Sequence, residues 1–224
     1  MNELEISQLF SKSFPFFDKI NDIERQTLLR SSQYVRFTRG TCIHDGGECT
    51  GVILIKSGSL RVYMISEEGK EITLYRLFPG EISILSASCV LDAITFDVFI
   101  DAEEDSECVV VGGCAFEEIA RRLPEVKIFT LESALERFSD VMWVIQQMLF
   151  MSMDKRLAIF LLEESRLAGS ETLSLTHEQI ARHLGTAREV VSRVLKHMAA
   201  DGLVEVSRGG ITIKDKTELL RLAQ

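Results

Sequence analysis

Two helix-start signals flank a glycine near the C-terminal end of the chain, and this arrangement restricts the fold more than any other feature. Thr176 precedes Gln179 by three residues, and Thr186 precedes Glu189 by the same spacing. Both pairs fit the capping box, in which two side chains satisfy free backbone amides at the start of a helix. Gly185 lies between them, where glycine commonly ends a helix. The segment therefore predicts two helices that are joined by a short turn and cross steeply.

A hairpin follows the second of these helices. Its strands are predicted over 204–206 and 211–213, on either side of the double glycine Gly209-Gly210. Two crossed helices followed by such a hairpin form a winged helix-turn-helix. The second helix, predicted over 187–201, exposes four polar or charged residues near its N-terminal end: Arg188, Glu189, Ser192 and Arg193.

The residue types on this surface suit the edges of DNA bases. An arginine fork matches the two acceptors of guanine, and a glutamate accepts from the amino group of cytosine. Threonines at helix starts suit phosphates. The alternative for Arg188 and Glu189 is an ordinary solvated pair on a helix. We expect the DNA-contacting residues to be Thr176, Thr186, Arg188, Glu189, Ser192, Arg193 and Arg208.

The acidic net charge of −9 is unevenly distributed along the chain. Residues 1–150 carry 14 Lys and Arg against 24 Asp and Glu, whereas residues 151–224 carry 11 against 10. The acidic excess therefore lies outside the predicted winged helix-turn-helix, and it does not exclude local contacts with nucleic acid. No export signal and no membrane-spanning run is found, so we expect a cytoplasmic protein without membrane contacts.

A long helix is predicted from Pro124, with apolar residues in steps of three and four. This is the spacing of a coiled-coil seam, maintained over nearly three heptads. One interpretation is a helix packed on its own domain, and the other is a helix that pairs with a second copy in parallel. The predicted dimer residues are Leu131, Leu135, Phe138, Met142, Ile145 and Leu149.

Short apolar runs broken by glycine-containing turns occupy residues 34–111, after a short helix predicted over 22–32. Such runs indicate β-strands in a roll, sandwich or barrel. We expect an α+β fold in three parts. These are an N-terminal antiparallel β-roll that senses a signal (1–123), a long dimerisation helix (124–152) and a C-terminal winged helix-turn-helix (153–224).

The run from Arg188 to Arg193, REVVSR, resembles the recognition helix of the CRP/FNR family of transcription regulators. The N-terminal part is similar to that family's cyclic-nucleotide-binding β-roll at Gly40, Ile43, Gly46, Glu48, Ile55, Gly58, Leu60, Gly69 and the run 78–81. The resemblance implies a regulator rather than an enzyme, which acts as a homodimer on a palindromic site with a TGA core. It also implies RNA polymerase as a partner, and a small-molecule or redox signal.

The predicted effector pocket departs from the nucleotide-binding members of the family, which carry an Arg-Ser pair about ten residues after the Gly-Glu turn. No arginine or lysine is found from Ile82 to Glu107. A buried phosphodiester would lack a cation there, which argues against cAMP as the effector. We expect an apolar pocket formed by Gly80, Glu81, Ile82, Leu85, Cys89, Val90, Leu91, Ile94 and Phe96.

The identity of the effector stays open. Five cysteines at scattered spacings predict free thiols, and the absence of a C-x2-C motif argues against an iron–sulfur cluster. Haem would need His44, for which an exposed loop position is expected instead, and we predict no metal site. Cys89 is a candidate redox sensor, although packing is the simpler role for it. The remaining alternatives are a thiol enzyme that uses Cys89 or Cys114, and an adaptor whose winged helix binds protein.

Overall fold

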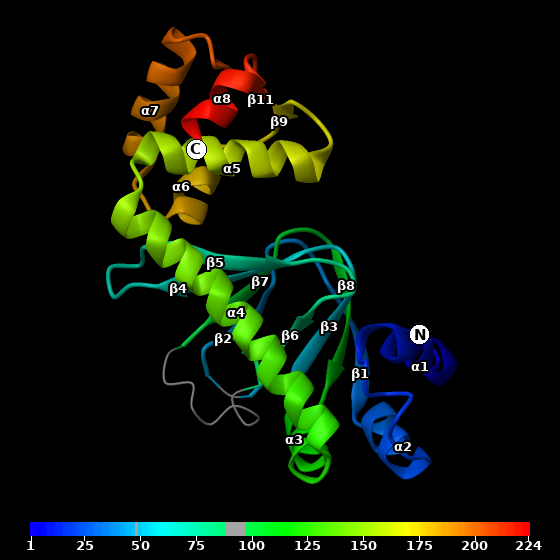
Figure 1. Ribbon diagram of the computed structural model, residues 1–224. Helices are drawn as coiled ribbons and strands as arrows, with labels where there is room; N and C mark the ends of the chain where they lie inside the picture. The colour runs from blue at the N-terminus through cyan, green and yellow to red at the C-terminus, as the bar shows by residue number, and fades with distance from the viewer. Residues whose placement is uncertain (48, 88–96) are drawn as a thin grey trace. The chain divides into compact units, whose positions relative to one another are not determined.

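The computed structural model describes residues 1–47, 49–87 and 97–224 (Figure 1). The chain divides into two compact units, each treated separately below. The first contains residues 1–64 and 74–141, and the second contains residues 65–73 and 142–224. Among the described residues, no helix is both long enough and apolar enough to cross a membrane.

Two four-stranded sheets with antiparallel pairing form the N-terminal β-roll, which confirms the predicted α+β fold. The first sheet has the order β1-β8-β3-β6, and the second has the order β2-β7-β4-β5. The strands are β1 (Ser32–Phe37), β2 (Cys42–Asp45), β3 (Val52–Ser57), β4 (Leu60–Ile65), β5 (Glu71–Leu77), β6 (Ile82–Ser83), β7 (Phe99–Ala102) and β8 (Ser106–Val111).

The core of the first unit contains β3 and three helices. Four consecutive residues of β3, from Val52 to Ile55, are fully buried, so both faces of this strand are covered. Helices α1 (Glu3–Ser13) and α2 (Asp22–Arg30) lie beside β1 of the sheet that contains it, and α3 (Gly113–Arg122) lies next to α2 (Figure 1). Phenylalanine rings from α1, the segment that follows it, α3 and α4 meet in edge-to-face and tilted pairs, which suit aromatic packing. These rings belong to Phe10, Phe14, Phe16, Phe17, Phe116 and Phe129.

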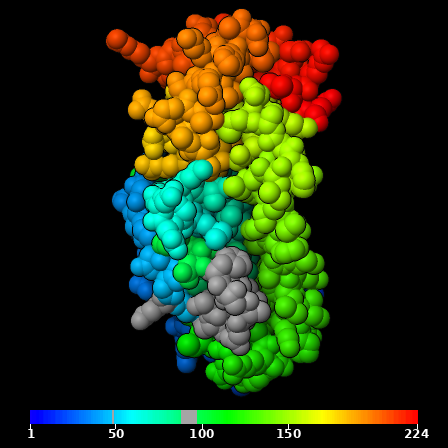
Figure 2. Space-filling model, turned by 90° about the vertical axis from the view of Figure 1, so that its left-hand side faces the viewer, coloured from blue at the N-terminus to red at the C-terminus, as the bar shows by residue number. Residues whose placement is uncertain are grey.

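Helix α4 (Pro124–Phe150) has 27 residues and two different long faces. Val126 and Thr130 are buried on one face, within the first unit. On the other face the six residues of the predicted seam are all exposed, by 39 to 68% of their surface. Side chains of this helix lie at the surface in Figure 2, where they are green to yellow-green. The exposed seam residues are Leu131, Leu135, Phe138, Met142, Ile145 and Leu149.

The second unit is a winged helix-turn-helix completed by a helix on each side. Its core is formed by α5, α6, α7 and α8 and by a three-stranded sheet of order β10-β11-β9. Leu157 and Leu161 of α5 and Leu219 of α8 are fully buried in this core. The elements are α5 (Met153–Ala168), β9 (Thr172–Leu173), α6 (His177–Leu184), α7 (Arg188–Ala200), β10 (Val204–Ser207), β11 (Gly210–Ile213) and α8 (Lys216–Leu222).

The two predicted capping boxes have different outcomes. Thr176 accepts from the amide of Gln179, and the Gln179 side chain accepts from the amide of Thr176, as predicted. The prediction for Thr186 and Glu189 is wrong, because α7 begins one residue later, with Ala187 as its N-cap and no side-chain cap. The amide of Thr186 instead donates to the carbonyl of Ala181, so this threonine completes the turn after α6.

Candidate functional site

Helix α7 presents a polar face along its whole length. Its apolar residues Val191, Val194, Leu195 and Met198 are buried, and the intervening residues are exposed. All four predicted base-reading residues belong to the exposed set. Lys196 and His197, which the sequence analysis did not single out, extend this face by one turn. The exposed residues of α7 are Arg188, Glu189, Ser192, Arg193, Lys196, His197 and Ala200.

The turn between α6 and α7 fixes where this face lies in the second unit. Gly185 has the left-handed conformation, with φ of +60° and ψ of 41°, which is easily reached only without a side chain. The guanidinium of Arg156 on α5 donates to the carbonyl of Leu184, one of the free carbonyls at the end of α6. Burial lowers the pKa of Arg156. The end of α6 is therefore fixed both by the left-handed turn at Gly185 and by the hydrogen bond from Arg156.

A hollow of about 370 Å³ lies between the start of α6, the start of α7 and the wing. Arg188 and Arg208 both contribute to its lining, and His177 does so from the first turn of α6. The hollow thus joins two cations with the amide end of a helix, a combination that suits a phosphate group. It is lined by Leu175, Thr176, His177, Glu178, Arg188, Val206, Ser207, Arg208, Gly210 and Ile211.

Only part of the predicted effector pocket belongs to the described residues. Gly80 is an exposed turn residue with φ of +91°, and Glu81 is half-buried. Ile82 and Leu85 are buried. The remaining predicted pocket residues lie outside the described part of the chain: Cys89, Val90, Leu91, Ile94 and Phe96.

Arg137 of α4 forms an ion pair with Glu81 that the sequence did not predict. A guanidinium nitrogen of Arg137 lies 3.5 Å from Glu81, and another lies 2.9 Å from Asp140. The guanidinium also lies 5.0 Å from the centre of the Tyr75 ring. Two carboxylates surround one guanidinium, so these charged groups sum to −1. No local sequence signal links Arg137 to Glu81, because 56 positions separate them.

Comparisons with known proteins match both units. A profile of the cyclic nucleotide-binding domain matches residues 34–122, and a profile of the Crp-like helix-turn-helix domain matches residues 155–222. A solved structure of a crp/fnr-family protein from Eubacterium rectale is 43% identical. It covers 94% of this chain and 98% of its own, with a TM-score of 0.92.

The chain belongs to the CRP/FNR family. Two of its relatives are the Cyclic AMP receptor protein of Thermus thermophilus and the transcriptional activator protein anr of Pseudomonas aeruginosa. The first is 26% identical over 95% of this chain and 98% of the relative, and the second is 28% identical over 80% and 75%. Members of this family are transcription regulators with a DNA-binding domain, which removes the thiol-enzyme alternative.

The predicted position of His44, the residue considered for haem in this CRP/FNR chain, is wrong. His44 belongs to β2 and is 6% exposed, rather than lying in an exposed loop. Its Nδ1 atom lies 2.8 Å from the hydroxyl of Thr50. Burial lowers the pKa of His44, although Asp45 and Asp97 oppose this effect. The pairing of β2 with β7 shifts register between the exposed Cys42 and His44, and such an irregularity can turn a side chain toward the core.

The cysteines differ from expectation at one position. Cys42, Cys108 and Cys114 are free thiols, whereas Cys49 is disulfide-bonded, contrary to the prediction that all thiols are free. The scattered spacing of the cysteines in the sequence could not reveal this bond. Burial raises the pKa of Cys108 to about 12, and burial is also the largest cause of the raised pKa of Cys42. Both shifts oppose a reactive thiolate.

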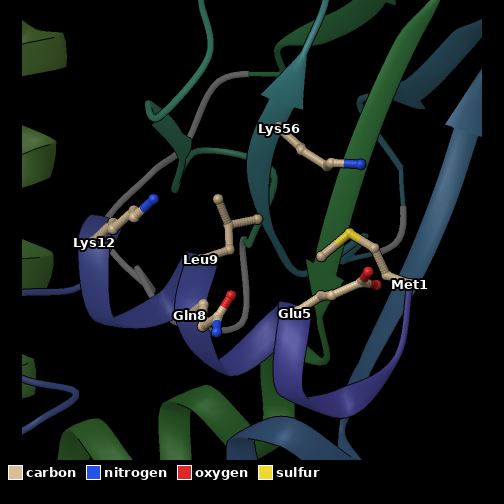
Figure 3. Close-up of a pocket in the computed structure, with 6 residues that line it drawn as sticks. All are labelled: Met1, Glu5, Gln8, Leu9, Lys12 and Lys56. Carbon is tan, nitrogen blue, oxygen red and sulfur yellow. The ribbon is translucent and has the colours of Figure 1, made fainter.

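A second hollow, of about 210 Å³, lies between α1 and the end of β3 (Figure 3). Lys56 and Lys12 lie at different ends of it, with Leu9 between them. Two of its charged groups are paired within the protein. The ammonium of Lys56 lies 2.6 Å from Glu107, and the carboxylate of Glu5 accepts from the amide of Asn2. We assign no function to this hollow.

Proposed function

We propose that this chain acts as a homodimeric regulator whose α7 helices read a palindromic DNA site with a TGA core. The observation that supports this most directly is the exposure of Arg188 and Arg193 on α7, beside the hollow shared with the wing. Two-fold symmetry of the protein requires two half-sites about one helical turn apart, roughly 34–36 Å between their centres.

The proposed roles follow from the chemistry of each side chain. Arg188, Glu189, Ser192 and Arg193 contact base edges, because they occupy the first two turns of α7. The remaining residues contact phosphates and set the register on the duplex without reading sequence. These are Thr176, Thr186 and Arg208, together with Lys196, which lies one turn beyond Ser192.

The proposed dimer contact is the exposed seam of α4. Apolar residues in steps of three and four over this length are unusual on a helix that faces only water. A second copy of the same helix would bury them in parallel, as in a two-stranded coiled coil. Parallel pairing also gives the two-fold symmetry that a palindromic site requires.

The proposed signal enters the β-roll near Glu81 and is not cAMP. The carboxylates of Glu81 and Asp140 already outnumber the single guanidinium of Arg137, so these groups disfavour a further anion. A small uncharged molecule is compatible with the buried apolar residues Ile82 and Leu85 nearby. A redox signal and RNA polymerase as a partner are carried over from the family resemblance.

Replacing Arg193 tests the reading of DNA. We expect Arg193→Ala to weaken binding to a TGA palindrome by about 1–3 kcal/mol, because one bidentate base contact is lost. Binding to a random duplex should change much less. Fluorescence anisotropy with both duplexes at one fixed salt concentration measures the difference.

The matched control is Arg221→Ala, which removes an exposed arginine of the same unit from α8. It should leave both affinities nearly unchanged. Equal losses on the palindrome and the random duplex in Arg193→Ala would show that this side chain contacts only phosphates. A parent protein without preference for the palindrome would contradict the proposed site itself.

A further inference from the structure

Arg137 occupies an unusual position on α4. The buried residues Val126 and Thr130 and the partly buried Val141 mark the face of α4 that packs on the core of the first unit. Arg137 continues this row, since it follows Val126 by eleven residues and precedes Val141 by four, which are close to whole turns. Its side chain is only 13% exposed. A charge in this position must be compensated by specific partners.

The partners of Arg137 join the helix to the turn before β6. Glu81 uses one carboxylate oxygen for the guanidinium of Arg137 and the other for the backbone amide of Phe78, which lies 2.7 Å away. The amide of Glu81 also donates to the carbonyl of Phe78. Glu81 is therefore held in the turn, and Arg137 connects this turn to α4.

Tyr75 on β5 lies beneath the same guanidinium. Its side chain is buried, and its hydroxyl has no hydrogen-bond partner within the described part of the chain. Burial and the carboxylate of Asp140 raise the pKa of Tyr75, while Arg137 opposes them. An unpartnered hydroxyl beside an ion pair offers an alternative contact to any group that moves there. The cluster thus contains one polar group, the Tyr75 hydroxyl, that is not satisfied by the described residues.

Arg137 is the neighbour in sequence of Phe138, which lies in the exposed seam. We propose that Arg137 is a positioning residue, through which the Gly80–Glu81 turn sets the position of α4 and of its seam. The proposal rests on the proposed function, in which the seam is the dimer contact. Any change at the turn that takes Glu81 from Arg137 would leave the guanidinium paired with Asp140 of its own helix, so this ion pair would no longer join the turn to α4 and the helix would loosen at this level.

The test compares two variants that break the contact with one that spares it. Arg137→Met and Glu81→Gln each remove one side of the ion pair between helix and turn. Asp140→Asn is the matched control, because Asp140 lies on α4 itself and its loss leaves that pair intact. Hydrogen exchange of the full-length chain measures amide protection in α4 around Phe138 and in the turn before β6.

We expect Arg137→Met and Glu81→Gln to lower protection at both places by at least about tenfold. Asp140→Asn should change it by less than about threefold. The double variant should lose no more than either single variant, because both remove the same contact. The conservative variant Arg137→Lys should keep protection at least in part, because it keeps a cation that can face Glu81, which a role in packing alone would not require.

Dimer dissociation, measured by sedimentation below the unfolding temperature of each variant, separates this proposal from the proposed function. Weakening of the dimer by Glu81→Gln supports the proposal, since Glu81 is not part of the seam. A monomeric parent whose α4 still loses protection in Glu81→Gln would contradict the dimer and leave the role of Arg137 supported. If Glu81→Gln leaves α4 protected while only the melting temperature falls, the role of Arg137 is overturned.

Discussion

The surroundings of two polar side chains in the first unit shift their pKa values. Burial lowers the pKa of His44, and the hydrogen bond from Lys56 lowers the pKa of the Glu107 carboxyl to about 2. Neither environment is visible in sequence. The partners of Glu107 lie on other strands, because β8 pairs with both β1 and β3. The identity of a residue can be read from sequence, whereas its burial and distant partners require the fold.

The histidine leads to a prediction for acid stability. Because the pKa of His44 is lowered in the folded state, the unfolded chain takes up this proton first as the pH falls below about 6.5. Stability from neutral His44 is fully present above that pH and is lost as the pH falls. We expect the free energy of unfolding to fall less between pH 7 and pH 5 in His44→Gln than in the parent. Urea unfolding followed by circular dichroism measures this change.

The exposed His197 on α7 provides the control for that experiment. His197→Gln should reproduce the pH dependence of the parent. Identical pH dependence in the parent and in His44→Gln would show that His44 does not contribute.

The disulfide of Cys49 is tested by counting thiols. In denaturant without reductant, iodoacetamide should label three of the five cysteines, namely Cys42, Cys108 and Cys114. Reduction should expose two more. In Cys49→Ser all four remaining cysteines should react without reductant, and mass spectrometry of peptides identifies the residue released. Five labelled cysteines before reduction would rule out the bond.

At the scale of elements, helices with a strong apolar period were predicted better than those that depend on tertiary contacts. The apolar spacing and the helix-start signals predicted the long helix from Pro124 and the pair of helices around Gly185. Helix α1, where Asn2 and Glu5 form a capping box, and helix α8 were not predicted. These helices are short, and packing on a core stabilises such helices more than propensity does. The start of α7 was predicted one residue too early for a similar reason, since the amide of Thr186 bonds to the carbonyl of Ala181 in the preceding turn.

The seam of α4 leads to a prediction at this scale. Phe138 is 59% exposed in one copy, and a second copy would bury it among apolar side chains. Phe138→Glu should raise the dimer dissociation constant by at least about tenfold, because an unpaired carboxylate is costly to bury. Sedimentation velocity over a concentration series measures the constant.

Ile23→Glu is the corresponding control, since Ile23 is an apolar residue on α2 with 80% exposure. The same carboxylate at that position should leave the association unchanged. Equal behaviour of the two variants would remove α4 as the contact between copies.

For the whole molecule, the sequence predicted the family and the fold class, because the recognition helix and the glycine pattern of the roll are local signals. It could not predict the cluster around Arg137, whose members come from β5, the following turn and α4. The division into a sensing part, a dimerisation helix and a reading part stays a prediction. Five of the nine predicted pocket residues lie outside the described chain, so the pocket as a whole stays a prediction as well.

The charge near Glu81 predicts how the whole protein responds to cAMP. A ligand that binds only the folded state raises the melting temperature as its concentration exceeds its dissociation constant. We expect 1 mM cAMP to leave the melting temperature of this chain unchanged. This concentration is roughly a thousand times a dissociation constant in the micromolar range. The Cyclic AMP receptor protein of Thermus thermophilus serves as the positive control. A reproducible rise of several degrees would contradict the proposal that the signal is not cAMP.

The buried side chains of α5 have a practical consequence for anyone who wishes to isolate the DNA-reading part. Leu157, Ala158 and Leu161 are fully buried against the helix-turn-helix, and β9 lies between α5 and α6. A peptide trimmed to 173–213 would lack these three side chains. It would expose to water the apolar surface of the helix-turn-helix that they cover, and it would aggregate. An excised fragment needs to start no later than Ser152, the N-cap of α5, and to retain α8.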